Sequence, residues 1–135
     1  MIYLVIPCYN EQEVLEDSTK KLASLIGRMQ GEDMRILFSD DGSRDETWNI
    51  ICKLHHQYPF VEGIRLAHNE GHQKALWAGM EAAADRAEAI ISIDADLQDD
   101  IEVIPRMVAD FRQGADVVYG VRKERDTDSA FKRQI

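Results

Sequence analysis

Residues 90–100, IISIDADLQDD, combine an apolar run with two closely spaced aspartates and an amide. Asp94, Asp96 and Gln98 occupy alternate positions, and alternate side chains of an extended segment point to the same side. Two carboxylates held close together repel each other, so their proximity needs a reason. A hard divalent cation such as Mg²⁺ or Mn²⁺, bound by oxygen atoms and shared with substrate phosphates, would supply one. A strand that ends in a solvated acidic turn is the alternative that these residues leave open.

The composition limits the class of protein. The chain has 135 residues, enough for one domain with a hydrophobic core, and 44% of them are hydrophobic. Its 16 Lys and Arg against 25 Asp and Glu give a net charge of -9, which argues against a general nucleic-acid binder. Cys8 and Cys52 show no metal or redox spacing, so reduced thiols are expected. The opening MIYLVIP is too short for a signal peptide, and no apolar run approaches the roughly 18 residues of a membrane span.

Strand and helix patterns alternate along the chain. Short buried runs predict strands at 3–6, 35–39, 61–66, 89–93 and 116–121. Helical spacing predicts helices at 11–29, 43–56, 73–86 and 101–113. A capping box from Ser43 to Glu46 is predicted to start the second helix, and Pro105 suits the first turn of the fourth. This order predicts one α/β domain with a mainly parallel sheet and helices on both faces, a Rossmann-like arrangement.

Polar clusters follow every predicted strand. They occupy residues 7–11, 39–43, 68–71, 94–98 and 120–122. Ligands of open α/β sheets bind at the carboxyl ends of the strands, so five polar loops on one edge predict a binding site. The sequence has no G-x-G-x-x-G after the first strand, no phosphate loop and no EF-hand spacing. His68 and His72 are four apart, but Gly71 breaks the helix that a zinc pair would need.

Five segments, in order along the chain, resemble a known family. They are VIPCYNEQEVL, SDDGSRDET, HNEGHQKALWAGMEAA, DADLQDD and ADVVYGVRKERDTDSAFKR. Together they resemble glycosyltransferase family 2, which has the GT-A fold, and more closely its branch of polyprenyl-phosphate sugar transferases, the dolichol-phosphate mannosyltransferase-like group. The resemblance implies an inverting transferase that moves a sugar from a UDP- or GDP-linked donor to an acceptor. The implied acceptor is a polyprenyl phosphate in cell-envelope glycan synthesis.

The resemblance implies roles for individual residues. The family's nucleotide-binding positions are matched by Pro7, Tyr9, Glu11, Asp41, Lys74 and Asp94. Tyr9 would stack on the base, Glu11 would accept a hydrogen bond from base or ribose, and Lys74 would reach a phosphate. The residues alone also allow Tyr9 to be a packed aromatic, Glu11 a first-turn helix acid and Lys74 a solvated lysine.

A metal site and a phosphate site are implied as well. Asp94, Asp96 and Gln98 would bind Mg²⁺ or Mn²⁺, while Arg122 and Arg125 would contact phosphates with their planar guanidinium groups. Asp96 and Arg122 are the expected catalytic residues, because a metal and an arginine stabilise charge that develops on the departing nucleoside diphosphate. A solvated charged face is the alternative for this basic stretch.

The chain ends at Ile135, so residues 1–135 are expected to be a GT-A domain that is incomplete at its C-terminus. Residues 1–121 would form the nucleotide-binding core, and residues 122–135 would begin the segment that contacts acceptor and phosphate. Such a chain is expected to bind donor, and it can do so without turnover. The full-length protein is expected to be cytoplasmic, at the inner face of a membrane that holds the lipid phosphate, although this chain contains no span.

Three other function classes fit parts of the pattern. A haloacid-dehalogenase-like phosphatase uses D-x-D-x-[TV], but Gln98 occupies the fifth position here and the motif follows the fourth strand. A nucleotide-sugar-binding module would bind donor and metal without transfer or hydrolysis. A sugar nucleotidyltransferase needs a glycine-rich loop with a lysine or arginine after the first strand, which this sequence lacks.

Overall fold

The computed structural model describes residues 1–98, 100–115, 117–122 and 129–134, the last two ranges by their backbone alone. Within these ranges no helix combines the length and the apolarity that are needed to cross a lipid bilayer. Contacts divide the chain into two compact units, Met1–Leu97 and Gln98–Ile135.

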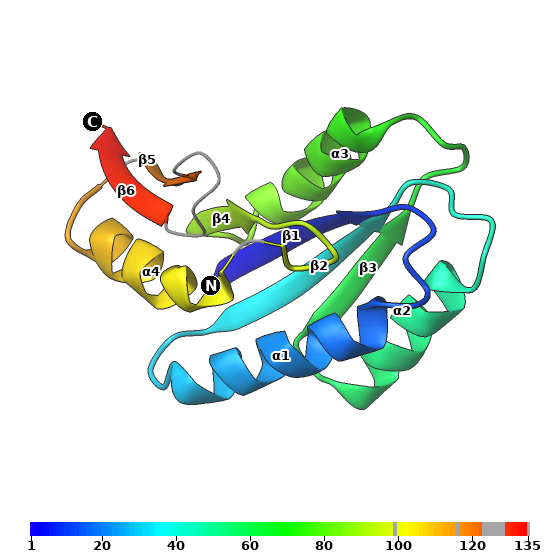
Figure 1. Cartoon of the computed structure of the whole chain (residues 1–135), viewed down its shortest axis with the longest axis horizontal. Helices are drawn as coiled ribbons and strands as arrows, with labels where there is room; N and C mark the ends of the chain where they lie inside the picture. Colours follow the sequence, from blue (N-terminus) through cyan, green and yellow to red (C-terminus); the bar gives the residue numbers. More distant parts are fainter. Residues whose placement is uncertain (99, 116, 123–128, 135) are drawn as a thin grey trace. The chain divides into compact units, whose positions relative to one another are not determined.

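The first unit is built on a four-stranded parallel sheet with the order β3-β2-β1-β4 (Figure 1). Its strands are β1 (Ile2–Cys8), β2 (Met34–Asp40), β3 (Val61–Arg65) and β4 (Ala89–Ser92). Every residue of β1 is buried, as a continuous apolar run predicts for a strand that is covered on both faces. Cys8 at the end of β1 pairs with Asp40 at the end of β2, so the polar segments after these strands leave the sheet side by side.

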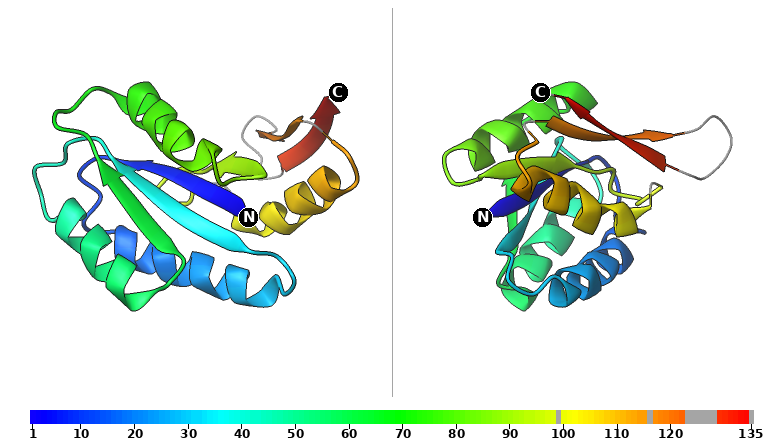
Figure 2. Two further views of the ribbon diagram at one scale, coloured as in Figure 1. Left: turned by 180° about the vertical axis from the view of Figure 1, so that it is seen from behind. Right: turned by 90° about the vertical axis from the view of Figure 1, so that its left-hand side faces the viewer.

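Helices cover both faces of this sheet (Figures 1 and 2). Helices α1 (Leu15–Arg28) and α2 (Thr47–Gln57) lie on one face, and α3 (His72–Ala84) lies on the other. A core cluster of Tyr3, Val5, Leu37 and Ala83 lies between α3 and the sheet. Gly79 lets α3 approach closely, because a Cβ at this position would lie 2.6 Å from Val5 Cγ1. The predicted α/β class, with a mainly parallel sheet and helices on both faces, is confirmed.

Two helices begin four residues later than the sequence predicts. The first starts at Leu15 instead of residue 11, and the second starts at Thr47 instead of residue 43. The predicted capping box is wrong, because the Ser43 hydroxyl is hydrogen-bonded to the Asp40 carboxylate and does not cap the helix. The free N–H of the first helical residue, Thr47, is instead bonded by Asp45, whose Oδ1 accepts a hydrogen bond from it at 2.9 Å.

The second unit contains a 3₁₀ turn, a helix and two strands. These are η1 (Ile101–Val103), α4 (Ile104–Arg112), β5 (Val117–Arg122) and β6 (Ser129–Gln134). Pro105 lies in the first turn of α4, as predicted. A strand near 116–121 is confirmed, but its predicted place in the parallel sheet is wrong, because β5 pairs antiparallel with β6 in a separate two-stranded sheet. The basic segment that forms β6 supplies the backbone partners of β5, and its charged pattern does not identify it as a strand.

Candidate functional site

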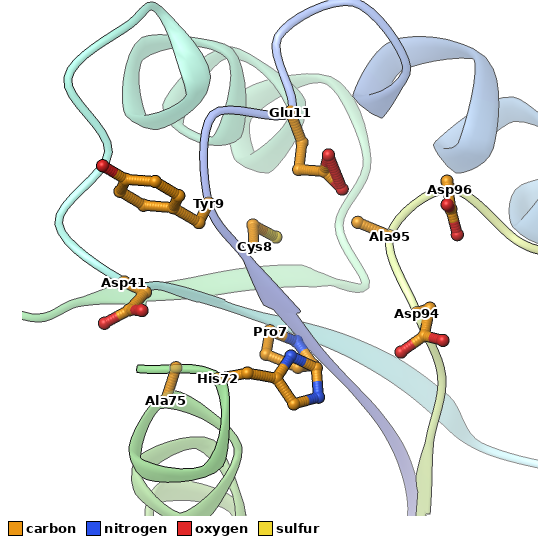
Figure 3. Close-up of a pocket in the computed structure, with 10 residues that line it drawn as sticks. All are labelled: Pro7, Cys8, Tyr9, Glu11, Asp41, His72, Ala75, Asp94, Ala95 and Asp96. Carbon is orange, nitrogen blue, oxygen red and sulfur yellow. The ribbon is translucent and has the colours of Figure 1, made fainter. Parts of the chain in front are cut away.

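A pocket of about 250 Å³ lies at the carboxyl ends of β1, β2 and β4, beside the start of α3 (Figure 3). Its lining comes from four separate segments and consists of Pro7, Cys8, Tyr9, Glu11, Asp41, His72, Ala75, Asp94, Ala95 and Asp96. The site residues among them that the sequence predicted are Pro7, Tyr9, Glu11, Asp41, Asp94 and Asp96. The pocket therefore occupies the edge of the parallel sheet at which α/β proteins bind ligands.

The loop after β1 presents Tyr9 and Glu11 to the pocket from either side of Asn10. Asn10 has a φ of 51°, in the left-handed region that asparagine tolerates better than most residues. Tyr9 is 42% exposed, so its ring is available for stacking and is not a packed core aromatic. Glu11 lies four residues before the start of α1, so it is not a first-turn acid of that helix.

Four carboxylates, those of Glu11, Asp41, Asp94 and Asp96, dominate the charge of the pocket. Asp94 and Asp96 lie on the wall that follows β4, and the carboxylate of Glu11 points toward that wall (Figure 3). Burial, and then the charges of Asp96, Asp45 and Asp94, raise the pKa of Glu11 above that of an ordinary glutamate. The pocket is therefore a region of negative potential, which favours a bound cation.

Asp94 and Asp96 suit a magnesium or manganese ion by the chemistry of their oxygen atoms. Magnesium in phosphate sites is usually held by one or two carboxylates, and phosphates and water complete its coordination. Nowhere in the described ranges do three His, Cys, Asp or Glu side chains gather closely enough to hold an ion by themselves. An ion at the two aspartates would therefore take further oxygens from a ligand or from water. Gln98 is the first residue of the second unit, and its place in the metal site stays a prediction.

Asp41 joins the end of β2 to the loop that leads into α3. Its buried carboxylate accepts hydrogen bonds from the Glu70 N–H at 2.7 Å, the Gly71 N–H at 3.0 Å and Asn69 Nδ2 at 3.1 Å. The adjacent Asp40 is fully buried and is not part of the pocket lining. Asp41 is therefore the aspartate of this pair that can face a ligand, and its contact with a nucleotide stays a prediction.

His72 lines the pocket, although its spacing from His68 draws attention only to zinc. It is the first residue of α3, and the fully buried Ala75 on the next turn also lines the pocket. Residues three apart share a helix face, so His72 and Ala75 line the pocket together, but the sequence carries no signal that distinguishes His72 as a site residue. Lys74 does not line the pocket, because its 73% exposed side chain forms an ion pair with Glu70 at 3.6 Å. The predicted contact between Lys74 and a phosphate stays a prediction.

Arg122 and Arg125, which the sequence predicts to bind phosphate, belong to the second unit. Arg122 is the last residue of β5, and its side chain lies outside the described part of the chain. Arg125 lies outside the described residues altogether. The phosphate contacts of both arginines, and the catalytic role of Arg122, stay predictions.

We expect Glu11→Gln to raise the Tm near neutral pH and to lose this advantage in acid. Because the pKa of Glu11 is raised in the folded protein, the folded state binds more protons than the unfolded state between the ordinary and the raised pKa. Stability therefore falls as the pH rises through that interval, and glutamine avoids this loss. Thermal unfolding from pH 3.5 to 7.5 should show the advantage vanish near pH 4, about the ordinary pKa of glutamate. A difference in Tm that is equal at every pH would contradict the electrostatic cause.

A family model and several known proteins are similar to this chain. The family model described as "Glycosyl transferase family 2" matches residues 3–135. The chain is 44% identical to the "Uncharacterized glycosyltransferase YkoT" of Bacillus subtilis, over 98% of this chain and 41% of that protein. It is 38% identical to the "Bactoprenol glucosyl transferase" of Shigella phage SfX, over 98% of this chain and 43% of that protein.

A further relative and a solved structure are also similar to this chain. The chain is 38% identical to the "Undecaprenyl-phosphate 4-deoxy-4-formamido-L-arabinose transferase" of Pseudomonas fluorescens, over 98% of this chain and 38% of that protein. The crystal structure of S. aureus TarS 1–349 matches with a TM-score of 0.63 and 17% identity, over 91% of this chain and 35% of that one. The structural match concerns the fold, and the chain spans less than half the length of these curated relatives.

Proposed function

This chain belongs to glycosyl transferase family 2, and we propose that it forms the nucleotide-sugar site of an enzyme that transfers a sugar to a polyprenyl phosphate. The family that the sequence motifs resemble is thereby confirmed. Relatives named for bactoprenol and undecaprenyl phosphate support this acceptor. Because the chain spans less than half of their length, the activity of the whole protein is part of the proposal.

One pocket gathers five of the six predicted nucleotide residues and two of the three predicted metal residues, and this observation carries the proposal. Tyr9 and Asp41 lie on one side of the pocket, and Asp94 and Asp96 lie on the other (Figure 3). An aromatic ring and a carboxylate acceptor suit the base and ribose of a nucleoside. A pair of aspartates suits a cation that carries the diphosphate. We therefore place the nucleoside at the Tyr9 side and the diphosphate at the Asp94 side.

The negative charge of the pocket supports a cation-dependent site. Four carboxylates would repel a diphosphate, so Asp94 and Asp96 would hold Mg²⁺ or Mn²⁺ between themselves and the donor. Such an ion, when bound, supplies positive charge against the negative charge of the departing nucleoside diphosphate. Asp41 and Glu11 would meanwhile orient the nucleoside, which fixes the sugar carbon relative to the acceptor.

The acceptor explains why no general base needs to be assigned. A phosphate monoester has a second pKa of about 6, so it is already mostly ionised near neutral pH. Such a nucleophile needs positioning more than deprotonation. We propose a single displacement with inversion at the sugar carbon, with Arg122 and Arg125 close to the phosphates.

Calorimetric titration of the chain with UDP, GDP and their sugar conjugates tests the proposal. Each ligand is titrated once with Mn²⁺ and once with a chelator. We expect binding of one nucleotide that depends on the metal, and this result would also identify the base. Absence of binding by all of them would overturn the assignment of the pocket to a nucleotide sugar.

We expect His72→Ala to weaken nucleotide binding by about three- to tenfold, and Lys74→Ala to weaken it less. The imidazole lines the pocket, whereas the ammonium group of Lys74 is paired with Glu70 in solvent, where such pairs contribute little. The dissociation constants of the two variants with Mn²⁺ and the preferred nucleotide measure the difference. A larger loss in Lys74→Ala would instead support the phosphate contact that the sequence predicts for Lys74.

A further inference from the structure

Five hydrogen bonds between side chains and backbone connect the loop after β1 to the loop after β2 and to Thr47, the first residue of α2. Three successive N–H groups donate to side-chain oxygens: Asn10 to Ser43 Oγ at 2.8 Å, Glu11 to Thr47 Oγ1 at 2.8 Å, and Gln12 to Asp45 Oδ2 at 3.3 Å. In return, the Arg44 N–H donates to Asn10 Oδ1 at 3.0 Å and the Glu46 N–H to Gln12 Oε1 at 3.1 Å. These bonds fix the path of the chain between the two residues that enter the pocket.

In two of these bonds, the hydroxyl that accepts from the N–H group also donates a hydrogen bond to a carboxylate. The Thr47 hydroxyl donates to Asp45 Oδ1 at 2.6 Å, and the Ser43 hydroxyl donates to the Asp40 carboxylate. Because each hydroxyl donates its proton to a carboxylate, its oxygen remains an acceptor for another donor. Here that donor is an N–H group of the loop after β1. Ser43 is 3% exposed and Thr47 is fully buried, so water cannot easily replace either acceptor. The two hydrogen bonds are partly buried, so water replaces a lost acceptor only in part, and this favours a fixed loop.

We propose that Thr47 and Asp45 are positioning residues for the nucleotide, because they hold the backbone at Glu11 and thereby the Glu11 carboxylate and the Tyr9 ring. Neither Thr47 nor Asp45 lines the pocket, so both act through the loop that does. The inference rests on the proposed function of the same pocket. A loop that is already ordered does not need to be ordered by the ligand, and this raises affinity.

Thr47→Val tests the inference, because valine keeps nearly the shape of threonine and removes the hydroxyl. We expect about tenfold weaker binding of the preferred nucleotide with Mn²⁺, and recovery of most of the affinity in Thr47→Ser. Thr19→Val is the matched control. Thr19 is equally buried, and its hydroxyl donates to the Leu15 carbonyl at 2.8 Å within α1, so removing this hydroxyl breaks a bond of the helix and no side-chain bond to the loop. We expect this control to bind nucleotide as the wild type does, even where it loses stability.

A second measurement separates positioning from general stability. Amide hydrogen exchange of the nucleotide-free protein should be faster at Glu11 in Thr47→Val, and unchanged there in Thr19→Val at matched unfolding free energy. If Thr47→Val does not fold, Ser43→Ala removes the parallel bond to Asn10 and carries the same expectations. Affinity within twofold of the wild type in a folded Thr47→Val overturns the inference alone. Absence of nucleotide binding by the wild type overturns the proposed function, and the inference with it.

Discussion

Replacing Asp96 with asparagine is expected to weaken nucleotide binding in the presence of Mn²⁺ at least about 100-fold, equivalent to about 2.8 kcal/mol. Asparagine keeps the size of the side chain and one oxygen, but it removes the negative charge that a hard cation prefers. Asp94 would then face the cation as the only aspartate of the pair. Because the Asp96 side chain is exposed, we expect the free energy of unfolding to change by no more than about 0.5 kcal/mol.

Calorimetric titration with Mn²⁺ and with chelator, together with thermal unfolding, measures both parts of this prediction. Asp85→Asn is the matched control, because it makes the same chemical change at an exposed aspartate that follows the last turn of α3. We expect this control to bind nucleotide like the wild type. Undiminished affinity in Asp96→Asn would remove Asp96 from the metal site. An equal loss in both variants would attribute the effect to the net charge of the chain.

Most of the pocket could be predicted from the sequence because parallel strands bring their carboxyl ends to one edge. The run that forms β1 is apolar throughout, which is typical of a strand buried on both faces, and polar residues follow it at once. The same reasoning places Tyr9, Asp41 and Asp94 together although they are far apart in the chain. Their convergence in one pocket follows from the topology and needs no knowledge of individual side-chain contacts.

The features that could not be predicted depend on hydrogen-bond partners that the local sequence pattern does not identify. Ser43 and Glu46 match a capping box, but the Ser43 hydroxyl bonds Asp40 and the loop after β1, so the helix starts at Thr47. The strand β5 has a strand-like sequence, but only its pairing with β6 determines the sheet to which it belongs. Local patterns identify an element, whereas the hydrogen-bond partner that decides its boundary or its neighbour comes from the rest of the fold.

Hydrogen bonds connect the segment after β2 to two other segments that lie beside the pocket. Thr47, at the start of α2, bonds the loop after β1, and Asp41 bonds the residues that directly precede α3. Gly42 lies between Asp41 and Thr47 in the sequence. A change at Gly42 is therefore expected to disturb both the stability of the first unit and the geometry of the site.

We expect Gly42→Ala to lower the free energy of unfolding by about 2–5 kcal/mol and to weaken nucleotide binding. Gly42 has a φ of +67°, which costs an alanine about 1–2 kcal/mol. An alanine Cβ would also lie 2.6 Å from the His68 carbonyl carbon and 2.7 Å from the Asn69 nitrogen. These are backbone atoms that no side-chain rotation can move, and relieving such an overlap costs about 1–3 kcal/mol more. The resulting shift would separate Asp41 from the N–H groups that it accepts.

Gly31→Ala separates the two causes. Gly31 also has a positive φ, of +92°, but apart from Gly31 and its two chain neighbours no described residue has an atom within 4 Å of the position that an alanine Cβ would take there. This control should show the backbone strain alone, about 1–2 kcal/mol in urea unfolding, with nucleotide affinity unchanged. The difference between the two variants then measures the close approach of the β2 loop to residues 68 and 69. Equal destabilisation by both substitutions would mean that the backbone of residues 68 and 69 moves away from the new alanine side chain at no cost in free energy. Normal nucleotide binding by a destabilised Gly42→Ala would show that the position of Asp41 does not matter to the ligand.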